Sequence, residues 1–349
     1  AWMEDNGFTN WRDYFESWPP DPEEKKRIRS QQHWPLPEEY HYTHWTGDRT
    51  IARIKESTEQ DKPFFIWSSF HDPHPPYLVP EPWASMYDPD DMDPGVLTEG
   101  EHEKNPVHFK MTQEENPAFR KMYFEDQGIH GFSSHLHDRE KLKKDMAIYY
   151  GMISFMDKEI GRILEALDQQ GIAENTIVVF STDHGHFLGQ HGLIAKGAFH
   201  YEDMIRIPFI VRWPGQAPAG MASDDIQNLV DLAPIFLAAA GEDVPGVMAG
   251  VNQLESWTGK GPARNWSITE NRHTYKNVHL RTYVNNRYKI TVYRGTDEGE
   301  LFDLEEDPGE INNLWNDSAA TDIKRELLLE FMQATLSTEQ TPMPRIAVA

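Results

Sequence analysis

Several side chains that can bind a metal ion or an anion lie within residues 178–197, which read VVFSTDHGHFLGQHGLIAKG. The first residues of this stretch are β-branched and apolar, which is typical of a strand buried on both faces. Asp183 and His184 follow directly, and Lys196 comes thirteen residues after Asp183 in a glycine-rich loop. Ligands of open α/β sheets bind beyond the carboxyl ends of the strands. These three side chains therefore lie where a ligand is expected.

The residue types indicate what that ligand is. The carboxylate of Asp183 is a hard oxygen donor suited to Ca²⁺ or Mg²⁺, while the imidazole of His184 suits Zn²⁺ or acts as a neighbouring hydrogen-bond donor. The ammonium group of Lys196 is a compact charge that can contact an oxyanion. Each residue also has a plainer interpretation: Asp183 caps the next turn, His184 is an ordinary buried histidine, and Lys196 is a surface lysine.

A second candidate is the loop HDPHPP, residues 71–76. It follows an apolar, aromatic run at residues 63–70 that has the length of a strand. Each proline fixes its own φ near −65°, which would preorganise His71 and His74. We expect this loop at the same sheet edge as Asp183, although a His-Pro loop by itself is more often a plain rigid loop.

Composition limits the class of protein. The chain has 349 residues, enough for one large domain or a large and a small one. Its net charge of −24 disfavours nucleic acid or an anionic membrane as a partner. An anionic substrate stays possible, because the field of distant charges is screened within about 10 Å. The chain has no Cys, which excludes disulfides, thiolate zinc sites and Cys nucleophiles from these residues. No apolar run reaches the roughly 20 residues that span a bilayer, and the N-terminus has no signal-peptide pattern.

The elements that must position the candidate residues follow from periodicity. Apolar residues three and four apart predict a helix over residues 145–170, whose methionine-rich stripe is core packing. Apolar runs predict strands at 176–182 and 206–213, and a second helix is predicted over 225–241. Strands and helices that alternate in this way favour an α/β sheet that is largely parallel.

The pattern changes after residue 265. Short strands separated by turn residues follow one another, and an amphipathic helix closes the chain at residues 322–336. This order predicts a small antiparallel α+β subdomain. We therefore expect two domains, with residues 1–265 forming part of an α/β domain and residues 266–349 forming the small sheet and helix.

Three separated blocks occur in the order found in the type I sulfatase family of the alkaline phosphatase-like superfamily, and the chain resembles that family over most of residues 45–315. The blocks are DKPFFIWSSFHDPHPPYLVPEPW, the long run from YYGMISFMDKEIG through STDHGHFLGQHGLIAKG to RIPFIVRWPG, and ELFDLEEDPGEINNL. The resemblance implies an alkaline phosphatase-like mixed, largely parallel sheet flanked by helices, with the small antiparallel subdomain at the C-terminal end.

The resemblance also implies residue roles. Asp183 resembles a Ca²⁺ ligand, and His184 occupies the next ligand position, with Mg²⁺ or Zn²⁺ as the less expected metals. His74 and Lys196 resemble the catalytic pair that contacts the sulfate and the leaving oxygen. Substrate contacts are expected from His200, and further ones from Arg272 and His273.

The family's nucleophile is a formylglycine made from Cys or Ser in a C-x-P-x-R type motif. This sequence contains no such motif, nor the pair of Asp that the family places after its first strand. We therefore expect that the chain lacks the N-terminal, nucleophile-bearing part and does not turn over by itself. It is a fragment or processed chain, one of two chains, or a degenerate non-catalytic relative.

The sequence as a whole predicts a sulfuric-ester hydrolase portion. Its partners would be a sulfated carbohydrate and the missing N-terminal segment, without nucleic acid or membrane, and the resemblance implies a periplasmic or extracellular location. The prediction of a carbohydrate substrate rests on Trp34, Trp45 and Trp83, which can stack on sugar rings or simply pack in the core. The alternatives are a phosphate or phosphonate monoester hydrolase of the same superfamily and a non-catalytic module that binds sulfated glycans.

Overall fold

The computed structural model of the chain describes residues 2–10, 32–60, 62–114, 138–272 and 278–339. These residues belong to two compact units, each of which is described by itself. Unit 1 takes its residues from 1–94 and 137–176, and unit 2 from 95–136 and 177–349. The predicted α/β class is confirmed, with a four-stranded antiparallel sheet near the C-terminus. The predicted domain boundary at residue 265 stays a prediction.

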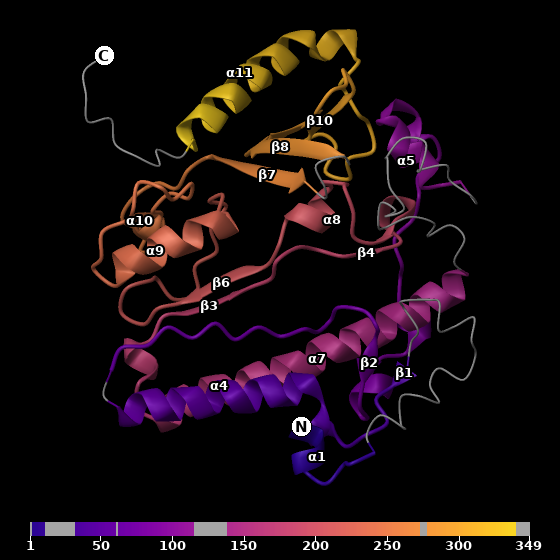
Figure 1. Ribbon diagram of the computed structural model, residues 1–349. Helices are drawn as coiled ribbons and strands as arrows, with labels where there is room; N and C mark the ends of the chain where they lie inside the picture. The colour runs from indigo at the N-terminus through magenta and orange to yellow at the C-terminus, as the bar shows by residue number, and fades with distance from the viewer. Residues whose placement is uncertain (1, 11–31, 61, 115–137, 273–277, 340–349) are drawn as a thin grey trace. The chain divides into compact units, whose positions relative to one another are not determined.

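Unit 1 is built on two long helices, α4 (Tyr42–Glu59) and α7 (Arg139–Gln169), which lie side by side (Figure 1). The helix predicted over residues 145–170 is confirmed as α7. It begins earlier than predicted because the carboxylate of Asp138 accepts a hydrogen bond from the backbone N–H of Glu140 and so caps the first turn. Gly171, at φ 69°, ends the helix in the left-handed conformation that glycine adopts without strain.

The remaining elements of unit 1 are short. They are α1 (Trp2–Asp5), β1 (Gln32–His33), η1 (Glu38–Tyr40), β2 (Leu78–Val79), η2 (Trp83–Ser85), η3 (Pro89–Asp91) and η6 (Ala173–Asn175). Strands β1 and β2 pair in parallel. Residues 63–70, predicted as a strand, form none, and Trp67 is 72% exposed. The prediction was wrong because an apolar run becomes a strand only when a neighbour pairs with its backbone, and no described residue forms that ladder.

Unit 2 contains the sheet predicted for the C-terminal part. Its strands are β7 (Trp266–Arg272), β8 (His279–Asn285), β9 (Tyr288–Tyr293) and β10 (Gly299–Asp303). Each pairs antiparallel with its neighbour in the order β10-β9-β8-β7. Helix α11 (Thr321–Ser337) lies along one face of the sheet (Figure 1). Tyr283, Ile290 and Leu301 of the sheet pack there against Leu327 and Phe331 of the helix.

The other face of this sheet supports the loop that carries the candidate residues. Because side chains alternate between the faces of a strand, Leu280 and Phe302 point away from α11 and pack against Phe187 and Phe199 of that loop. These four side chains are fully buried. Each stabilises the fold by about 1.5–3 kcal/mol through removal of apolar surface from water. The sheet therefore supports the loop through buried apolar contacts.

The loop itself begins at β3 (Val178–Ser181) and ends at β6 (Phe209–Arg212). These strands confirm two predicted elements, but they pair antiparallel and are only half-buried. A parallel pair needs a long crossover connection. Between β3 and β6 the chain forms only β4 (Phe187–Leu188), η7 (Gln190–Gly192), β5 (Ile194–Ala195) and α8 (Glu202–Ile205). Alternation of elements along the sequence does not by itself determine strand direction.

The other elements of unit 2 are η4 (Glu101–Lys104), α5 (Val107–Met111), η8 (Leu229–Asp231), α9 (Leu232–Ala239), α10 (Leu254–Trp257) and η9 (Ser318–Ala320). The helix predicted over residues 225–241 is thus shorter, and its first part is a loop that Asn228 ends by capping the backbone N–H of Val230. Among the described helices of both units, none combines the length and the apolar character needed to cross a lipid bilayer.

Candidate functional site

Asp183 and His184 lie immediately beyond the end of β3, as predicted. The carboxylate of Asp183 is largely exposed and accepts a hydrogen bond from the backbone N–H of His184, 3.0 Å away. The Nδ1 atom of His184 lies 2.7 Å from the carbonyl oxygen of Gly185. Because that oxygen only accepts, Nδ1 carries the proton and donates. The Nε2 atom of a neutral His184 is then an acceptor, 3.4 Å from Oδ2 of Asp183.

Lys196 joins this pair. Its ammonium nitrogen lies 3.0 Å from Nε2 of His184. The lysine follows β5, whose neighbours Phe187 and Leu193 are fully buried. Phe187 on β4, which pairs with Ala195, and Leu193 just before β5 therefore anchor the backbone that precedes Lys196. The structure thus brings together Asp183, His184 and Lys196, three of the residues singled out by the sequence.

Gly185 makes the close packing of this site possible. Its backbone N–H donates a hydrogen bond of 2.8 Å to the carbonyl oxygen of Met204. A Cβ atom at position 185 would lie only 1.8 Å from the carbonyl oxygen of Asp203. No residue other than glycine fits without displacement of one of the two backbones. The backbone after His184 is therefore fixed directly against α8.

Asp183, His184 and Lys196 line a pocket of about 510 Å³ within unit 2. The lining also includes polar side chains, those of Gln227, Asn228, Ser267, Thr269, Glu270 and Asn271, together with apolar ones. Ser267, Thr269 and Asn271 alternate along β7 and so share one face of that strand. The pocket lining therefore combines a cation and an imidazole with hydroxyl and amide groups that suit a polyhydroxylated ligand.

His200, predicted to contact substrate, also lines this pocket. Only 3% of it is exposed, and its Nδ1 atom lies 2.7 Å from the hydroxyl oxygen of Thr282. Burial and the nearby charge of Lys289 lower the pKa of His200 to about 3. His200 is therefore neutral at ordinary pH and can take part in hydrogen bonds without adding charge to the pocket.

Of the two other predicted substrate contacts, Arg272 is the last residue of β7. Arg272 is half exposed and forms an ion pair of 2.5 Å with Glu270, a pocket residue. Burial raises the pKa of Glu270, but the combined effect of Arg281 and Arg272 lowers it by more. The net shift is therefore downward and the carboxylate stays charged. His273 lies outside the described residues.

His74 belongs to unit 1, whereas the residues of the pocket just described belong to unit 2. Its Nδ1 atom lies 2.6 Å from the carbonyl oxygen of Pro75, and the ring centroids of His71 and His74 are 4.9 Å apart. Between them, Asp72 is buried and accepts a hydrogen bond from the hydroxyl of Thr43. A buried carboxyl group therefore anchors the loop, while its predicted rigidity stays a prediction.

The tryptophans considered as sugar-stacking residues have different environments. Trp34 is buried in a small core cluster, and Trp83 stacks on Phe155 and donates a hydrogen bond to Glu38. Packing, the alternative interpretation, thus accounts for both. Trp45 lies on α4 with 40% of its surface exposed.

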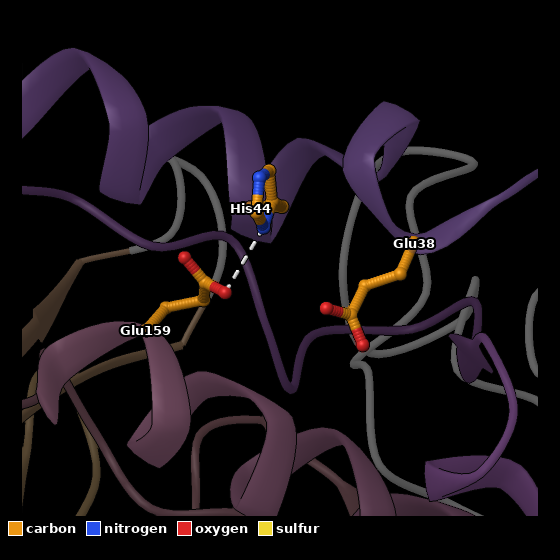
Figure 2. Close-up of side chains that lie close together, drawn as sticks. All are labelled: Glu38, His44 and Glu159. Atoms are coloured by element: carbon orange, nitrogen blue, oxygen red, sulfur yellow. Dashed lines mark hydrogen bonds and ion pairs between the residues drawn. The ribbon is translucent and has the colours of Figure 1, made fainter. Parts of the chain in front are cut away.

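The sequence analysis missed a second group of ligand-type side chains, Glu38, His44 and Glu159, in unit 1 (Figure 2). One donor atom from each lies within 4.8 Å of the others. However, Lys158 contacts Glu38, and Arg162 contacts the second oxygen of Glu159. The i,i+3 spacing of Glu159 and Arg162 in the sequence predicts their ion pair. The contacts between α4 and α7 that add His44 to this group are not predictable from the sequence. Because both carboxylates already have cationic partners, we interpret this group as an ion-pair network.

Asp183 and His184 offer two side-chain atoms that can coordinate a metal ion at the pocket. Oδ2 of Asp183 and Nε2 of a neutral His184 are both acceptors and lie 3.4 Å apart, with the ammonium group of Lys196 beside Nε2. Their separation suits two ligands of one ion, although Zn²⁺ takes four ligands and Ca²⁺ six to eight. Asp183 and His184 therefore fit as part of a ligand set. No third His, Asp or Glu of the described residues joins them at ligand spacing.

Comparison with known proteins identifies the family. Its model, described as Sulfatase, matches residues 2–242, and a second model, described as N-sulphoglucosamine sulphohydrolase, C-terminal, matches residues 189–337. An uncharacterized sulfatase of Escherichia coli is 26% identical over 85% of the chain, and an arylsulfatase of Clostridium perfringens 28% over 81%. An N-acetylglucosamine-6-O-sulfatase of Bacteroides thetaiotaomicron is 34% identical over 54% of the chain and 35% of its own length.

Two solved structures share the fold. A phosphonate monoester hydrolase of Silicibacter pomeroyi superposes with a TM-score of 0.79 at 21% identity, covering 99% of this chain and 70% of its own. A phosphonate monoester hydrolase of Agrobacterium radiobacter gives 0.73 at 23% identity, covering 88% and 63%. The chain spans about half the length of the first two sulfatases, 56% and 55%. Since the sulfatase model matches well over half of the sequence, the chain belongs to the sulfatase family.

Proposed function

We propose that the protein to which this chain contributes hydrolyses sulfate esters. The observation that carries the proposal is that Nε2 of His184 lies 3.4 Å from Oδ2 of Asp183 and 3.0 Å from the ammonium nitrogen of Lys196, at a pocket that all three residues line. Two acceptors and an ammonium group in contact suit a cation and an oxyanion side by side. Membership of the sulfatase family supports sulfate as that oxyanion.

In this proposal Asp183 and His184 are metal ligands. Nδ1 of His184 donates to the carbonyl oxygen of Gly185, which fixes the ring and leaves Nε2 as the atom that would ligate the ion, with Lys196 beside it. Sulfatases are generally metal-dependent, and we propose Ca²⁺, with Mg²⁺ or Zn²⁺ as alternatives. A divalent cation held there would neutralise negative charge on sulfate oxygens.

Lys196 and His74 are the proposed catalytic residues of this chain. The ammonium group of Lys196 is held in place before any ligand arrives, so it stabilises developing negative charge without reorganisation. Such a contact is commonly worth about 3 kcal/mol in the transition state. His74 is proposed to donate to the leaving oxygen through Nε2, because its Nδ1 is engaged by Pro75.

We propose that a segment outside this chain supplies the formylglycine nucleophile and the remaining metal ligands. Two facts support it: the chain spans about half the length of its relatives, and its pocket holds only part of a ligand set. That segment belongs to the same protein or to a partner chain.

The proposed substrate is a sulfated carbohydrate. Gln227, Thr269 and Asn271 offer amide and hydroxyl groups in the pocket, which match the hydroxyls of a sugar. His200, Arg272 and His273 are proposed as further substrate contacts. One relative is named an N-acetylglucosamine-6-O-sulfatase, and another a Delta 4,5-hexuronate-2-O-sulfatase. A periplasmic or extracellular location follows from this substrate class as part of the proposal.

The test uses the protein from its complete reading frame, assayed with 4-nitrophenyl sulfate, 4-nitrophenyl phosphate and a phenylphosphonate monoester. We expect sulfate ester hydrolysis to be the fastest, and Lys196→Ala to lower kcat/KM about 100-fold. Lys260→Ala, a change of an exposed lysine in the same unit, is the control and should have no effect. A chelator should abolish activity, and Ca²⁺ should restore it.

The alternatives predict different results. A phosphate or phosphonate hydrolase is supported at the level of fold by the two solved structures, and it would show the opposite order of substrates. A non-catalytic module would bind sulfated glycans without turnover. Either result would overturn the proposal.

A further inference from the structure

Within unit 2, the buried residues Glu101 and His191 form a group with the exposed Asp203 that the proposed function does not use. Nδ1 of His191 lies 3.3 Å from Oε1 of Glu101, and Nε2 lies 3.3 Å from Oδ2 of Asp203. Carboxylates only accept hydrogen bonds, so both ring nitrogens must carry a proton. The imidazole also stacks on Tyr201, with centroids 3.6 Å apart and planes 3° from parallel. His191 is therefore held as a cation in one orientation.

The backbone of His191 is fixed as well. Its N–H donates to the carbonyl oxygen of Val96, and its own carbonyl oxygen accepts from Nε2 of His102. The residue has φ 56° and ψ 23°, a left-handed conformation that few residues other than glycine adopt. Contacts from side chain and backbone together over-determine this conformation, which is the usual condition for such strain to persist.

These contacts connect the two halves of the candidate site. His191 lies five residues before Lys196 on the same loop. Its partner Asp203 belongs to α8, whose backbone is in direct contact with Gly185, the residue after His184. The pair of His191 and Asp203 thus ties the lysine loop to the backbone that follows the metal-ligand pair.

We propose that His191 is a positioning residue that holds the Lys196 loop against the segment carrying Asp183 and His184. The effect on catalysis rests on the proposed function, whereas the effect on the order of the loop does not.

The charges around the imidazole ring favour its protonated form. Burial alone lowers the pKa of His191, but the hydrogen bonds that the ring donates to Asp203 and Glu101 raise it to about 9. Of the other groups facing it, His102 is kept neutral because burial lowers its pKa. The buried Glu300 adds attraction when it is ionised, and burial raises its pKa to about 7. The net surroundings of the ring are therefore anionic.

Hydrogen exchange of the chain tests the proposal without any need for activity. His191→Asn removes the charge and the second hydrogen bond, and asparagine tolerates the left-handed conformation better than other residues. Ile290→Val, in the core on the α11 side of the sheet, is the matched control for a loss of stability. We expect amides of residues 187–197 to exchange at least tenfold faster in His191→Asn than in the control, compared at equal global stability. Glu101→Gln and Asp203→Asn should give the same local effect if His191→Asn does not fold.

Two results would overturn the proposal: unchanged exchange of residues 187–197 in all three variants, or an equal increase in the Ile290→Val control. In the complete protein, His191→Asn should lower kcat/KM at least tenfold, mainly through kcat, while Ile290→Val leaves it unchanged. An inactive complete protein would overturn the proposed function, yet the exchange experiment would still decide whether His191 orders the loop.

Discussion

The two units each contain a loop with a candidate catalytic side chain, and each anchors that loop with a buried ionisable group, but by opposite means. In unit 1, burial raises the pKa of Asp72 to about 7, although hydrogen bonds from Thr43 and Tyr42 oppose the shift. The nearest cation candidate, His41, is itself neutral because burial lowers its pKa to about 4. Asp72 is therefore accommodated by loss of its charge. In unit 2, His191 keeps its charge because two carboxylates face it.

The comparison teaches that burial alone does not determine the state of an ionisable group; the partners do. A charge without a partner is too costly to bury, so the group changes its protonation instead. Both groups bind a proton more tightly in the folded protein than in the unfolded chain. Both therefore make stability fall as pH rises, but over different windows of pH.

The largest expected effect concerns Asp72. Its pKa is near 4 in the unfolded chain and about 7 in the folded one, so the free energy of unfolding falls as pH rises from 4 to 7, by about 4 kcal/mol. Asp72→Asn keeps the group neutral and should remove this loss, which makes the variant more stable than the parent at pH 8. Urea denaturation followed by tryptophan fluorescence at pH 5 and pH 8 measures it. Asp90→Asn, at an exposed aspartate of unit 1, is the control, and the same slope in both variants would refute the assignment.

The next effect concerns His191. The stability it contributes is fully present below pH 6.5 and is lost as pH rises through about 9, an amount of about 3 kcal/mol. His191→Asn should therefore be less stable than the parent at pH 6 and nearly equal to it at pH 10. His108→Asn is the control, because burial lowers the pKa of His108 to about 3 and it stays neutral over this window. A difference between parent and His191→Asn that does not change with pH would contradict the charged state.

One glycine in each unit shows how closely the backbone there is packed against its neighbours. Gly161 lies exposed within α7, and a Cβ there would meet nothing within 4 Å, so Gly161→Ala should stabilise the chain by about 1 kcal/mol through helix propensity. At Gly185 the Cβ would collide with the backbone of Asp203, so Gly185→Ala should destabilise it by about 1–3 kcal/mol. Thermal unfolding of both variants measures the difference, and equal signs would mean that the contact at Gly185 is not rigid.

The parts of the fold that were predictable from the sequence are those governed by local periodicity. Helix α7 and the four strands after residue 265 have strong 3.6- and two-residue patterns, and turn residues separate them. The direction of β3 against β6, and the absence of a strand at residues 63–70, depend on which backbones meet. No pattern within a single segment records that information.

The candidate site divides in the same way. Asp183, His184 and Lys196 were recognisable because they follow a strand within one short loop, and the structure brings them into contact. The roles of Glu101 and Asp203 were not predictable, since they reach His191 from η4 and α8, and Glu101 lies ninety positions away in sequence. Long-range partners of this kind are fixed only by tertiary packing.

The smallest expected effect comes from the network of Glu38, His44 and Glu159 in Figure 2. Lys158 and Glu38 are both partly exposed, so Lys158→Met should lower the free energy of unfolding by only about 0.5 kcal/mol. The difference should shrink in 1 M salt, where charges are screened within about 3 Å. Arg162→Met should cost more, because Glu159 is fully buried and would lose its cation. Adding Zn²⁺ to Lys158→Met sharpens the interpretation: an ion-pair network predicts no change in melting temperature, since Arg162 still occupies Glu159. A clear rise would show that the three side chains bind a metal once the lysine is gone.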